Sequence, residues 1–126
     1  MYNIGFKYTE NDIDMSLKID AFFGKSTKMK SKPCDGMDTV LAIVAIAGFT
    51  LEFAKFIIDY IVKPSIEKNK NKKKDEQSGE EKSISANRCI VYNGKTITPS
   101  LLSTKLDGKE CTPENILEII CEEFQL

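Results

Sequence analysis

An almost unbroken apolar run at residues 39–62 constrains this chain more than any other feature of its sequence. Asp38 can cap a helix that starts there, and Pro64 can end it. In the second half of the run, polar residues recur at spacings of three and four, which is typical of an amphipathic helix. Positions 40–49 are apolar on every side, which indicates a helix enclosed by a core or by lipid. The sequence therefore predicts one long helix over about residues 38–63.

The predicted helix is long enough to cross a membrane. A helix over residues 39–62 would extend about 36 Å, and bilayer hydrocarbon is about 30 Å thick. Its Val, Leu, Ile and Phe side chains favour insertion, whereas Glu52, Lys55 and Asp59 oppose it by a similar free energy. Two interpretations stay open, a buried helix with one solvated stripe and a single membrane span.

Either interpretation leaves apolar surface on this helix that the rest of the chain is too small to cover. Such surface usually marks contact with another protein, a second copy or a bilayer. We therefore expect the predicted helix to dock a partner protein, to self-associate or to contact a membrane. The side chains expected at this contact are Leu41, Val44, Phe49, Phe53 and Phe56.

The N-terminal residues show the two-residue alternation of half-buried strands. Apolar side chains occupy every second position over residues 2–8 and again over 13–21, with turn-forming residues at 9–12 between them. This pattern predicts a β-hairpin, followed by a loop over residues 24–37. A helix over residues 11–23 is the competing interpretation.

Residues 64–87 are dominated by Lys, Glu, Asn, Asp and Ser. A segment of this composition cannot bury enough apolar surface to offset the entropy lost on ordering, so we expect a disordered linker. It would divide the chain into an N-terminal part at residues 1–63, made of the hairpin and the long helix, and a C-terminal part at residues 88–126.

The C-terminal part carries the clearest local signals in the chain. Asn93 and Gly94 lie between two β-prone runs and favour a two-residue hairpin turn, because both turn positions need a positive φ. The resulting register pairs Ile90 with Ile97. Thr112, followed by proline and glutamate, is a suitable N-cap for a closing helix. The whole sequence thus predicts an α+β fold in the order ββα, linker, ββα, with one long apolar central helix and a short C-terminal helix.

The predicted closing helix is acidic and carries no basic residue. Glu114, Glu118 and Glu122 recur every four residues and so fall on one face. Glu122 and Glu123 lie at the helix end where the dipole disfavours negative charge. A solubilising surface is one interpretation of this face, and an acidic docking face for a basic partner is the other.

The composition excludes several kinds of chemistry. The chain contains no histidine, which rules out Ser-His-Asp and Cys-His catalysis and every His-ligated metal site. Its four cysteines form no Cys-x-x-Cys pair, and among them only Cys111, just before a helix start, has a potentially activating neighbour. No signal-peptide pattern opens the sequence, so we expect reduced thiols and a cytoplasmic or membrane-associated location. We expect no enzymatic activity, cofactor or metal, and the net charge of -1 does not favour a specific nucleic-acid partner.

A long apolar helix, a charged spacer, a strand pair at residues 90–97 and a closing helix together resemble the small effector-associated accessory proteins of bacterial conflict systems. The resemblance covers about residues 39–126 and is one of layout. It implies an accessory component that couples sensors to effectors such as proteases, and it carries over no functional residue. We therefore expect a non-catalytic accessory or adaptor protein of a bacterial defence system. The alternative is a single-pass or membrane-associated protein with a small soluble head.

Overall fold

The computed structural model describes residues 1–24, 26–34, 37–64 and 88–126, which form an α+β fold around one antiparallel sheet. The sheet has five strands in the order β2-β3-β1-β4-β5. The strands are β1 (Tyr2–Thr9), β2 (Thr27–Cys34), β3 (Met37–Ile46), β4 (Cys89–Tyr92) and β5 (Lys95–Ile97). The helices are α1 (Ile13–Phe23), α2 (Leu51–Ile57), the π-helical turn η1 (Ile58–Val62), α5 (Pro99–Leu106) and α6 (Pro113–Glu123).

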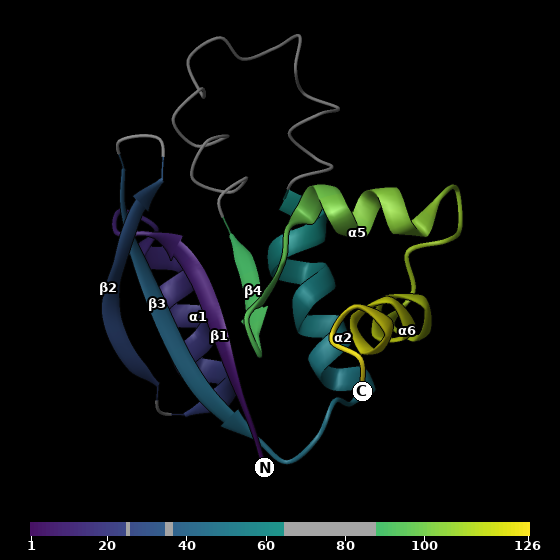
Figure 1. The fold of residues 1–126 in the computed structure, drawn as a ribbon, viewed down its shortest axis with the longest axis horizontal. Coiled ribbons are helices and arrows are strands. Elements are labelled where there is room, and N and C mark those ends of the chain that lie inside the picture. Colours follow the sequence, from purple (N-terminus) through teal and green to yellow (C-terminus); the bar gives the residue numbers. More distant parts are fainter. Residues whose placement is uncertain (25, 35–36, 65–87) are drawn as a thin grey trace, which may run out of the picture.

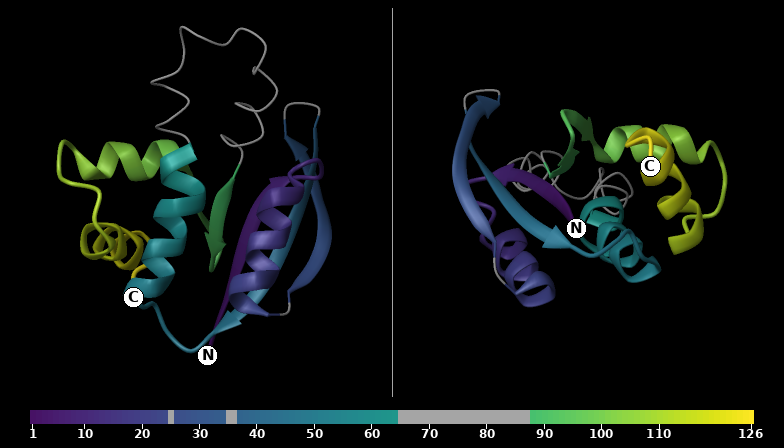
Figure 2. Two further views of the ribbon diagram at one scale, coloured as in Figure 1. Left: turned by 180° about the vertical axis from the view of Figure 1, so that it is seen from behind. Right: turned by 60° about the horizontal axis from the view of Figure 1, so that its bottom comes forward.

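Helices cover one face of the sheet, which we call the helix face. Seen from behind, α1 lies in front of the strands, α2 lies beside β4, and α5 and α6 pack beyond α2 (Figures 1 and 2). The core lies between these helices and the sheet, where Ile4, Phe6 and Tyr8 of β1 are at most 2% exposed. The Phe6 ring lies 5.4 Å from that of Phe23 in α1 and 5.6 Å from that of Phe56 in α2. The opposite side of the sheet, the open face, carries no described helix (Figure 1).

The predicted long helix over residues 38–63 is wrong. Its first half is the strand β3, and its second half is α2 followed by η1. On each face of the sheet, most β3 side chains are at least half-buried. A strand shielded on both faces has an unbroken apolar sequence instead of an alternating one, which is why this segment looked like a helix. Gly48 falls between the strand and the helix. Thr50 then starts the helix, because its hydroxyl accepts a hydrogen bond from the Phe53 N–H at 3.2 Å.

The predicted second strand at residues 13–21 is also wrong, and the competing helix is what forms. Asp12 is its N-cap, with Oδ1 accepting from the Met15 N–H at 3.2 Å. In a helix, residues two apart lie almost opposite each other, so an alternating sequence presents apolar side chains on two sides. Met15 and Ile19 are fully buried, whereas Ile13 and Leu17 are exposed.

The predicted loop over residues 24–37 contains a strand. β2 pairs antiparallel with β3, from Thr27 opposite Ile43 to Ser31 opposite Thr39, with an irregularity before Cys34. The many lysines of this segment are typical of a loop, which is why a loop was predicted. They are also common on edge strands such as β2, because a lysine there prevents a further strand from adding to the sheet.

The predicted strand near residues 2–8 and the predicted C-terminal elements are confirmed. Asn93 and Gly94 have φ values of 52° and 80°, and β4 pairs with β5 in the expected register. Thr112 caps α6 by accepting from the Asn115 N–H at 3.2 Å. Helix α5 was not predicted; Thr98 caps it in the same way. The predicted linker, apart from Pro64, lies outside the described residues.

The two parts of the chain on either side of that segment share the sheet and the core. β4 pairs antiparallel with β1, from Gly5 opposite Val91 to Lys7 opposite Cys89. The observed order of elements is βαββα before residue 64 and ββαα after residue 88, in place of the predicted ββα, linker, ββα.

A buried ion pair ties β4 to the start of α1. The Arg88 guanidinium donates to Asp12 from Nε (2.6 Å, to Oδ2) and from Nη2 (2.8 Å, to Oδ1). Its third nitrogen, Nη1, donates to the Tyr60 carbonyl at 2.8 Å. Tyr60 belongs to η1, so Arg88 joins the start of β4 to both α1 and η1.

Candidate interaction surface

The most solvent-exposed line of α1 is apolar. Ile13, Leu17 and Ala21 follow one another at intervals of four residues, and we call them the α1 stripe. Ile13 is 67% exposed and Leu17 is 60% exposed, and Ala21 is also exposed. A spacing of four places them one above another on the side of the helix that points away from the sheet. On most surface helices this position belongs to charged or polar residues.

The fold does not need the α1 stripe. The opposite side of α1 supplies Met15 and Ile19 to the core, and both are fully buried. Polar residues at positions 13 and 17 would leave those two contacts in place and would make the helix amphipathic in the usual way. Apolar residues at adjoining exposed positions are therefore a candidate for contact with another molecule.

The residues that border the α1 stripe carry carboxylates. Asp14 has a 65% exposed side chain, 3.8 Å from the Arg88 Nη2 that already serves Asp12. Asp20, on the other border, accepts hydrogen bonds from Lys28 Nζ at 2.8 Å and from the Ser26 hydroxyl at 3.1 Å. The hydrogen bond from Lys28, followed by that from Ser26, lowers the pKa of Asp20, and the same bond to Asp20 raises the pKa of Lys28.

The five residues expected to contact a partner or membrane do not share a surface. Val44, Phe53 and Phe56 are each 2% exposed and belong to the core. Phe49 is partly buried, with its ring 5.1 Å from that of Tyr2. Leu41 lies on the open face of the sheet. The expectation of one apolar docking helix built from these residues is therefore wrong, because the chain encloses three of them itself.

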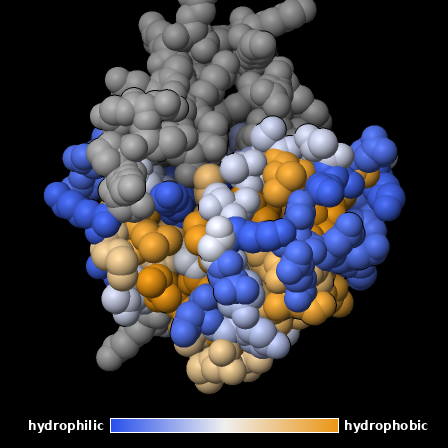
Figure 3. All heavy atoms as spheres, viewed as in Figure 1, coloured by the Kyte–Doolittle hydropathy of each residue, from blue (hydrophilic) through white to orange (hydrophobic). Residues whose placement is uncertain are grey.

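The open face of the sheet holds a second group of apolar side chains. Leu41, Ile43 and Val91 are half-buried there, and Met29 is 45% exposed. The space-filling view from this side shows hydrophobic side chains gathered over β1 and β3, between hydrophilic borders (Figure 3). Leu41 packs directly over Gly5, since a Cβ at that glycine would come within 2.8 Å of Leu41 Cδ1.

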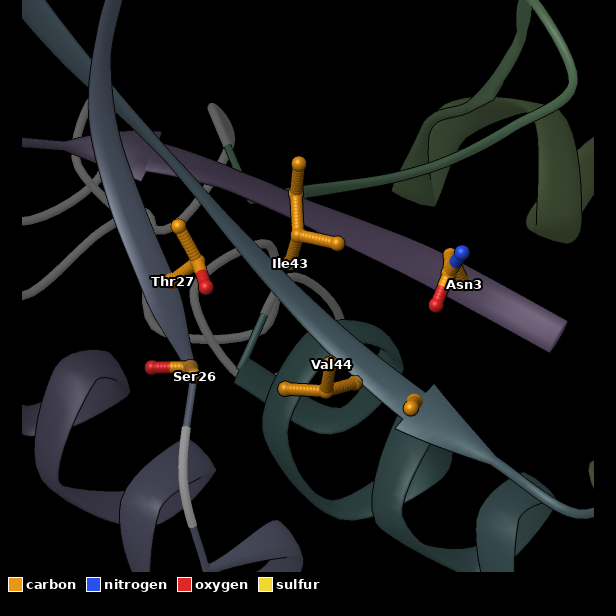
Figure 4. A pocket seen from close by; sticks show the side chains of 6 residues that line it. Asn3, Ser26, Thr27, Ile43 and Val44 are labelled. Atoms are coloured by element: carbon orange, nitrogen blue, oxygen red, sulfur yellow. The ribbon is translucent and has the colours of Figure 1, made fainter. Parts of the chain in front are cut away.

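A pocket of about 320 Å³ opens at one end of β3 (Figure 4). It lies where β2 begins beside β3. Its polar lining comes from Asn3, Ser26 and Thr27, and its apolar lining from Ile43, Val44 and Ala45. The volume is near the lower end of the range for small-molecule sites, about 300–1,000 Å³. Among the described residues, its lining combines hydroxyl and amide groups with aliphatic side chains.

The three glutamates predicted to form an acidic docking face do lie together. Glu114, Glu118 and Glu122 are all exposed, on one side of α6. Glu123, on a different side, lies 3.7 Å from Lys105. Like charges four residues apart weaken a helix by roughly 0.2–0.5 kcal/mol per pair, so this face lowers the stability of α6.

Carboxylates and thiols of the described residues were the remaining candidates for metal binding or nucleophilic reactivity. Within that part of the chain, no group of three or more His, Cys, Asp or Glu side chains is placed to hold a metal ion. The carboxylate of Asp12 is committed to Arg88 and to the α1 N-terminus. Burial raises the pKa of the Cys111 thiol, although nearby Lys63 opposes the shift, and burial also raises that of Cys121. Cys111 is thus deactivated rather than activated as a nucleophile.

No match was found among protein families, curated proteins or solved structures. A single membrane span, one of the two interpretations left open for residues 39–62, would require one continuous helix, whereas β3 occupies the first half of this segment. In the ranges that the structure describes, no helix combines the length and apolar composition needed to cross a bilayer.

The α1 stripe was missed because the alternating pattern at residues 13–21 was assigned to a strand. One signal could have identified it. Asn11 and Asp12 precede the first apolar residue of that segment and are good helix-capping residues. Once a helix is assumed there, the alternation itself predicts a second apolar side opposite the buried one.

Proposed function

We propose that this chain is a non-catalytic accessory protein of the cytoplasm that docks a partner protein through the α1 stripe. The observation that carries the proposal is the position of Ile13 and Leu17, on the outermost line of a helix whose other side already fills the core. Exposed aliphatic side chains at intervals of four residues are the pattern that a helix uses to anchor in the groove of a partner.

The size of the stripe favours a partner groove over a second copy of the same stripe. Full burial of a Leu or Ile side chain is worth about 1.5–3 kcal/mol, which at about 25 cal/mol per Å² corresponds to roughly 60–120 Å². Two such side chains, about two-thirds exposed, together with one alanine offer roughly 100–200 Å². A stable pair of proteins usually buries about 800 Å² on each partner. The stripe alone is therefore too small for a stable contact. A partner groove that encloses α1 would also bury the residues on both sides of the stripe.

The charges beside the stripe indicate the character of the groove. Asp14 and Asp20 flank the stripe on opposite borders, whereas Lys18 is turned toward the Tyr60 ring, 5.8 Å from its centroid. Because Asp20 is already paired with Lys28, Asp14 is the bordering carboxylate that a basic group on the rim of an apolar groove would complement. The proposed partner is therefore a protein with an apolar groove that accepts about two turns of helix and carries a basic group on the rim beside Asp14.

Affinity capture with matched variants tests the proposal. The tagged full chain is incubated with lysate of the organism that encodes it, alongside Ile13→Gln/Leu17→Gln and the control Leu51→Gln. Leu51 is also an exposed leucine, 47% exposed, but it lies at the start of α2. A protein retained by the wild type and by Leu51→Gln, and lost with the double variant, is then purified and titrated.

The expected loss of affinity follows from the exposed area. Partial burial of Ile13 and Leu17 is worth roughly 1–2 kcal/mol each, so the double variant should raise the Kd about 30-fold to 700-fold. Thermal unfolding of the double variant should match the wild type, since neither side chain is part of the core. Retention of the same protein by the double variant, or no protein retained by the wild type, would refute the proposal.

Two earlier expectations stay predictions beside this proposal. Glu114, Glu118 and Glu122 offer a second, acidic surface for a basic partner, and their exposure on one side of α6 supports it. The resemblance to accessory proteins of bacterial conflict systems included a long apolar helix, which in this chain is replaced by β3 and α2. The strand pair and the closing helix are the remaining support for a role in defence.

A further inference from the structure

Arg88 fixes the residue that starts α1. Asp12 accepts a hydrogen bond from the Met15 N–H at 3.2 Å through Oδ1, and the same oxygen accepts from Arg88 Nη2 at 2.8 Å. Its other oxygen, Oδ2, accepts from Arg88 Nε at 2.6 Å. The carboxylate that caps the helix is thus held in one orientation by a buried guanidinium, whose planar fork matches the two carboxylate oxygens. The next residue is Ile13, the first member of the α1 stripe.

The first turn of α1 depends on its cap more than the rest of the helix does. Met15 supplies the buried side chain of this turn, whereas Ile13 and Leu17 are exposed. The Ser16 N–H donates to the Asp12 carbonyl over 3.3 Å, which is long for a backbone hydrogen bond. Helix ends fray unless capping and packing hold them. The order of this turn therefore depends on the cap at its start.

The last turns of α1 are anchored independently of Arg88. Ile19 is fully buried. The Phe23 ring lies 5.4 Å from that of Phe6 and 5.2 Å from that of Phe56. Since parts of a fold with fewer buried contacts open more readily, loss of the contact with Arg88 would disorder the first turn and leave the last turns in place.

Arg88 reaches α1 from another part of the chain. It directly precedes β4, which pairs with β1, and its Nη1 donates to the Tyr60 carbonyl of η1 at 2.8 Å. The Tyr60 ring also lies beside α1, with Lys18 Nζ 5.8 Å from its centroid. The exposed carboxylate of Asp14 lies 3.8 Å from Arg88 Nη2. One border of the stripe is therefore in contact with Arg88 and Tyr60, which join it to β4 and η1.

We infer that Arg88 is a positioning residue for the α1 stripe, which couples docking through α1 to the attachment of β4 and η1. By fixing Asp12, Arg88 keeps the first turn folded and so keeps Ile13 in line with Leu17. When the contact breaks, the turn unfolds locally, and the fraction of molecules that present both side chains falls. The apparent Kd for a partner then rises by the inverse of that fraction. The inference rests on the proposed docking function and adds the means by which the rest of the chain controls it.

Backbone N–H order parameters from NMR relaxation of the full chain test the inference without a partner. Arg88→Lys keeps the buried charge but loses the planar fork of donors. We expect the order parameters of residues 14–16 to fall from about 0.85 to below about 0.6, and those of residues 19–22 to stay near 0.85. Lys28→Met is the matched control, because it breaks the ion pair at the other end of α1 and should leave residues 14–16 rigid. A loss of global stability alone would not change these values, since they report the motion of folded molecules.

Arg88→Met/Asp12→Asn carries the same test if Arg88→Lys does not fold, because it removes the contact together with both buried charges. Rigid residues 14–16 in the variant that folds, or equal mobility along the whole of α1, would overturn the inference. For a protein identified by affinity capture, Arg88→Lys should raise the Kd about tenfold or more, and an unchanged Kd would also overturn it. Failure of the capture experiment would refute docking, and the order parameters would still decide whether Arg88 positions α1.

Discussion

Replacing Arg88 with methionine should remove a large part of the stability of this protein. Arg88 and Asp12 have side chains that are 7% and 2% exposed, and they are joined by two hydrogen bonds of 2.6 and 2.8 Å. Removing one member of such a pair leaves a buried charge without a partner, which costs about 3–5 kcal/mol. The Tyr60 carbonyl also loses its donor, at about 1 kcal/mol. Against a typical total of about 5–15 kcal/mol, Arg88→Met should lose from about a quarter to all of the stability of the protein.

A second substitution separates the charge from the packing. Asp12→Asn keeps an oxygen that can accept from the Met15 N–H, so the cap of α1 survives while the buried charge is removed. The double variant Arg88→Met/Asp12→Asn has no buried charge, and it should be more stable than Arg88→Met alone by about 2 kcal/mol or more.

Urea unfolding, followed by far-ultraviolet circular dichroism and by tyrosine fluorescence, measures all four members of this cycle. The chain has four tyrosines and no tryptophan, which makes tyrosine the usable fluorophore. A loss below about 1 kcal/mol for Arg88→Met would show that the pair is not buried as described. A double variant no more stable than Arg88→Met would refute the explanation by an unpaired charge.

Three further predictions follow from burial. Ile19→Gln should cost about 2–4 kcal/mol in urea unfolding, whereas Leu17→Gln, two residues away, should stay within about 0.5 kcal/mol; equal losses would contradict the placement of α1. Gly5→Ala should cost about 1 kcal/mol or less, because the atom that its Cβ would meet at 2.8 Å, Leu41 Cδ1, is the end of a half-buried side chain that can turn aside; a larger loss would mean that Leu41 is held in place. Burial raises the pKa of Cys111, so at pH 7.5 this thiol should react with iodoacetamide more slowly than a free thiol of ordinary pKa, and its rate should rise roughly tenfold per pH unit. A rate faster than that of the free thiol would contradict the deactivation of Cys111.

Local signals predicted the C-terminal part of the chain well. Asn93 and Gly94 define the turn by their own backbone preferences, so the register of β4 and β5 followed from the sequence without reference to the rest of the fold. Thr112 identified the start of α6 for the same reason. The similar cap at Thr98, with Pro99 after it, would have identified α5 had the same rule been applied there.

The central part could not be predicted from local pattern, because tertiary neighbours decide it. The apolar run at residues 40–46 has no period, and an unbroken run is compatible with a shielded strand as well as a buried helix. Pairing with β1 and β2 selects the strand. Gly48 and Thr50 were the available evidence for a boundary inside the run, since a glycine and a capping residue interrupt a helix.

The candidate surface was missed for a related reason. Ile13 and Leu17 alternate with Met15 and Ile19 along the chain. A strand would place all four side chains on one face, whereas a helix places Ile13 and Leu17 on one side and Met15 and Ile19 on the opposite side. Folding as a helix splits them into a buried pair and an exposed pair. The surplus apolar side that results on α1 is the feature from which docking is proposed.

Site-specific photo-cross-linking along α1 tests docking through the α1 stripe most directly. A photoreactive amino acid is placed in turn at positions 13, 17 and 21, and at Glu114 and Glu118 on α6, in cells that express the chain. One and the same partner protein should be joined to the three α1 positions, and neither α6 position should yield that adduct. Adducts from the α6 positions alone, or equal yields at all five positions, would contradict docking through α1.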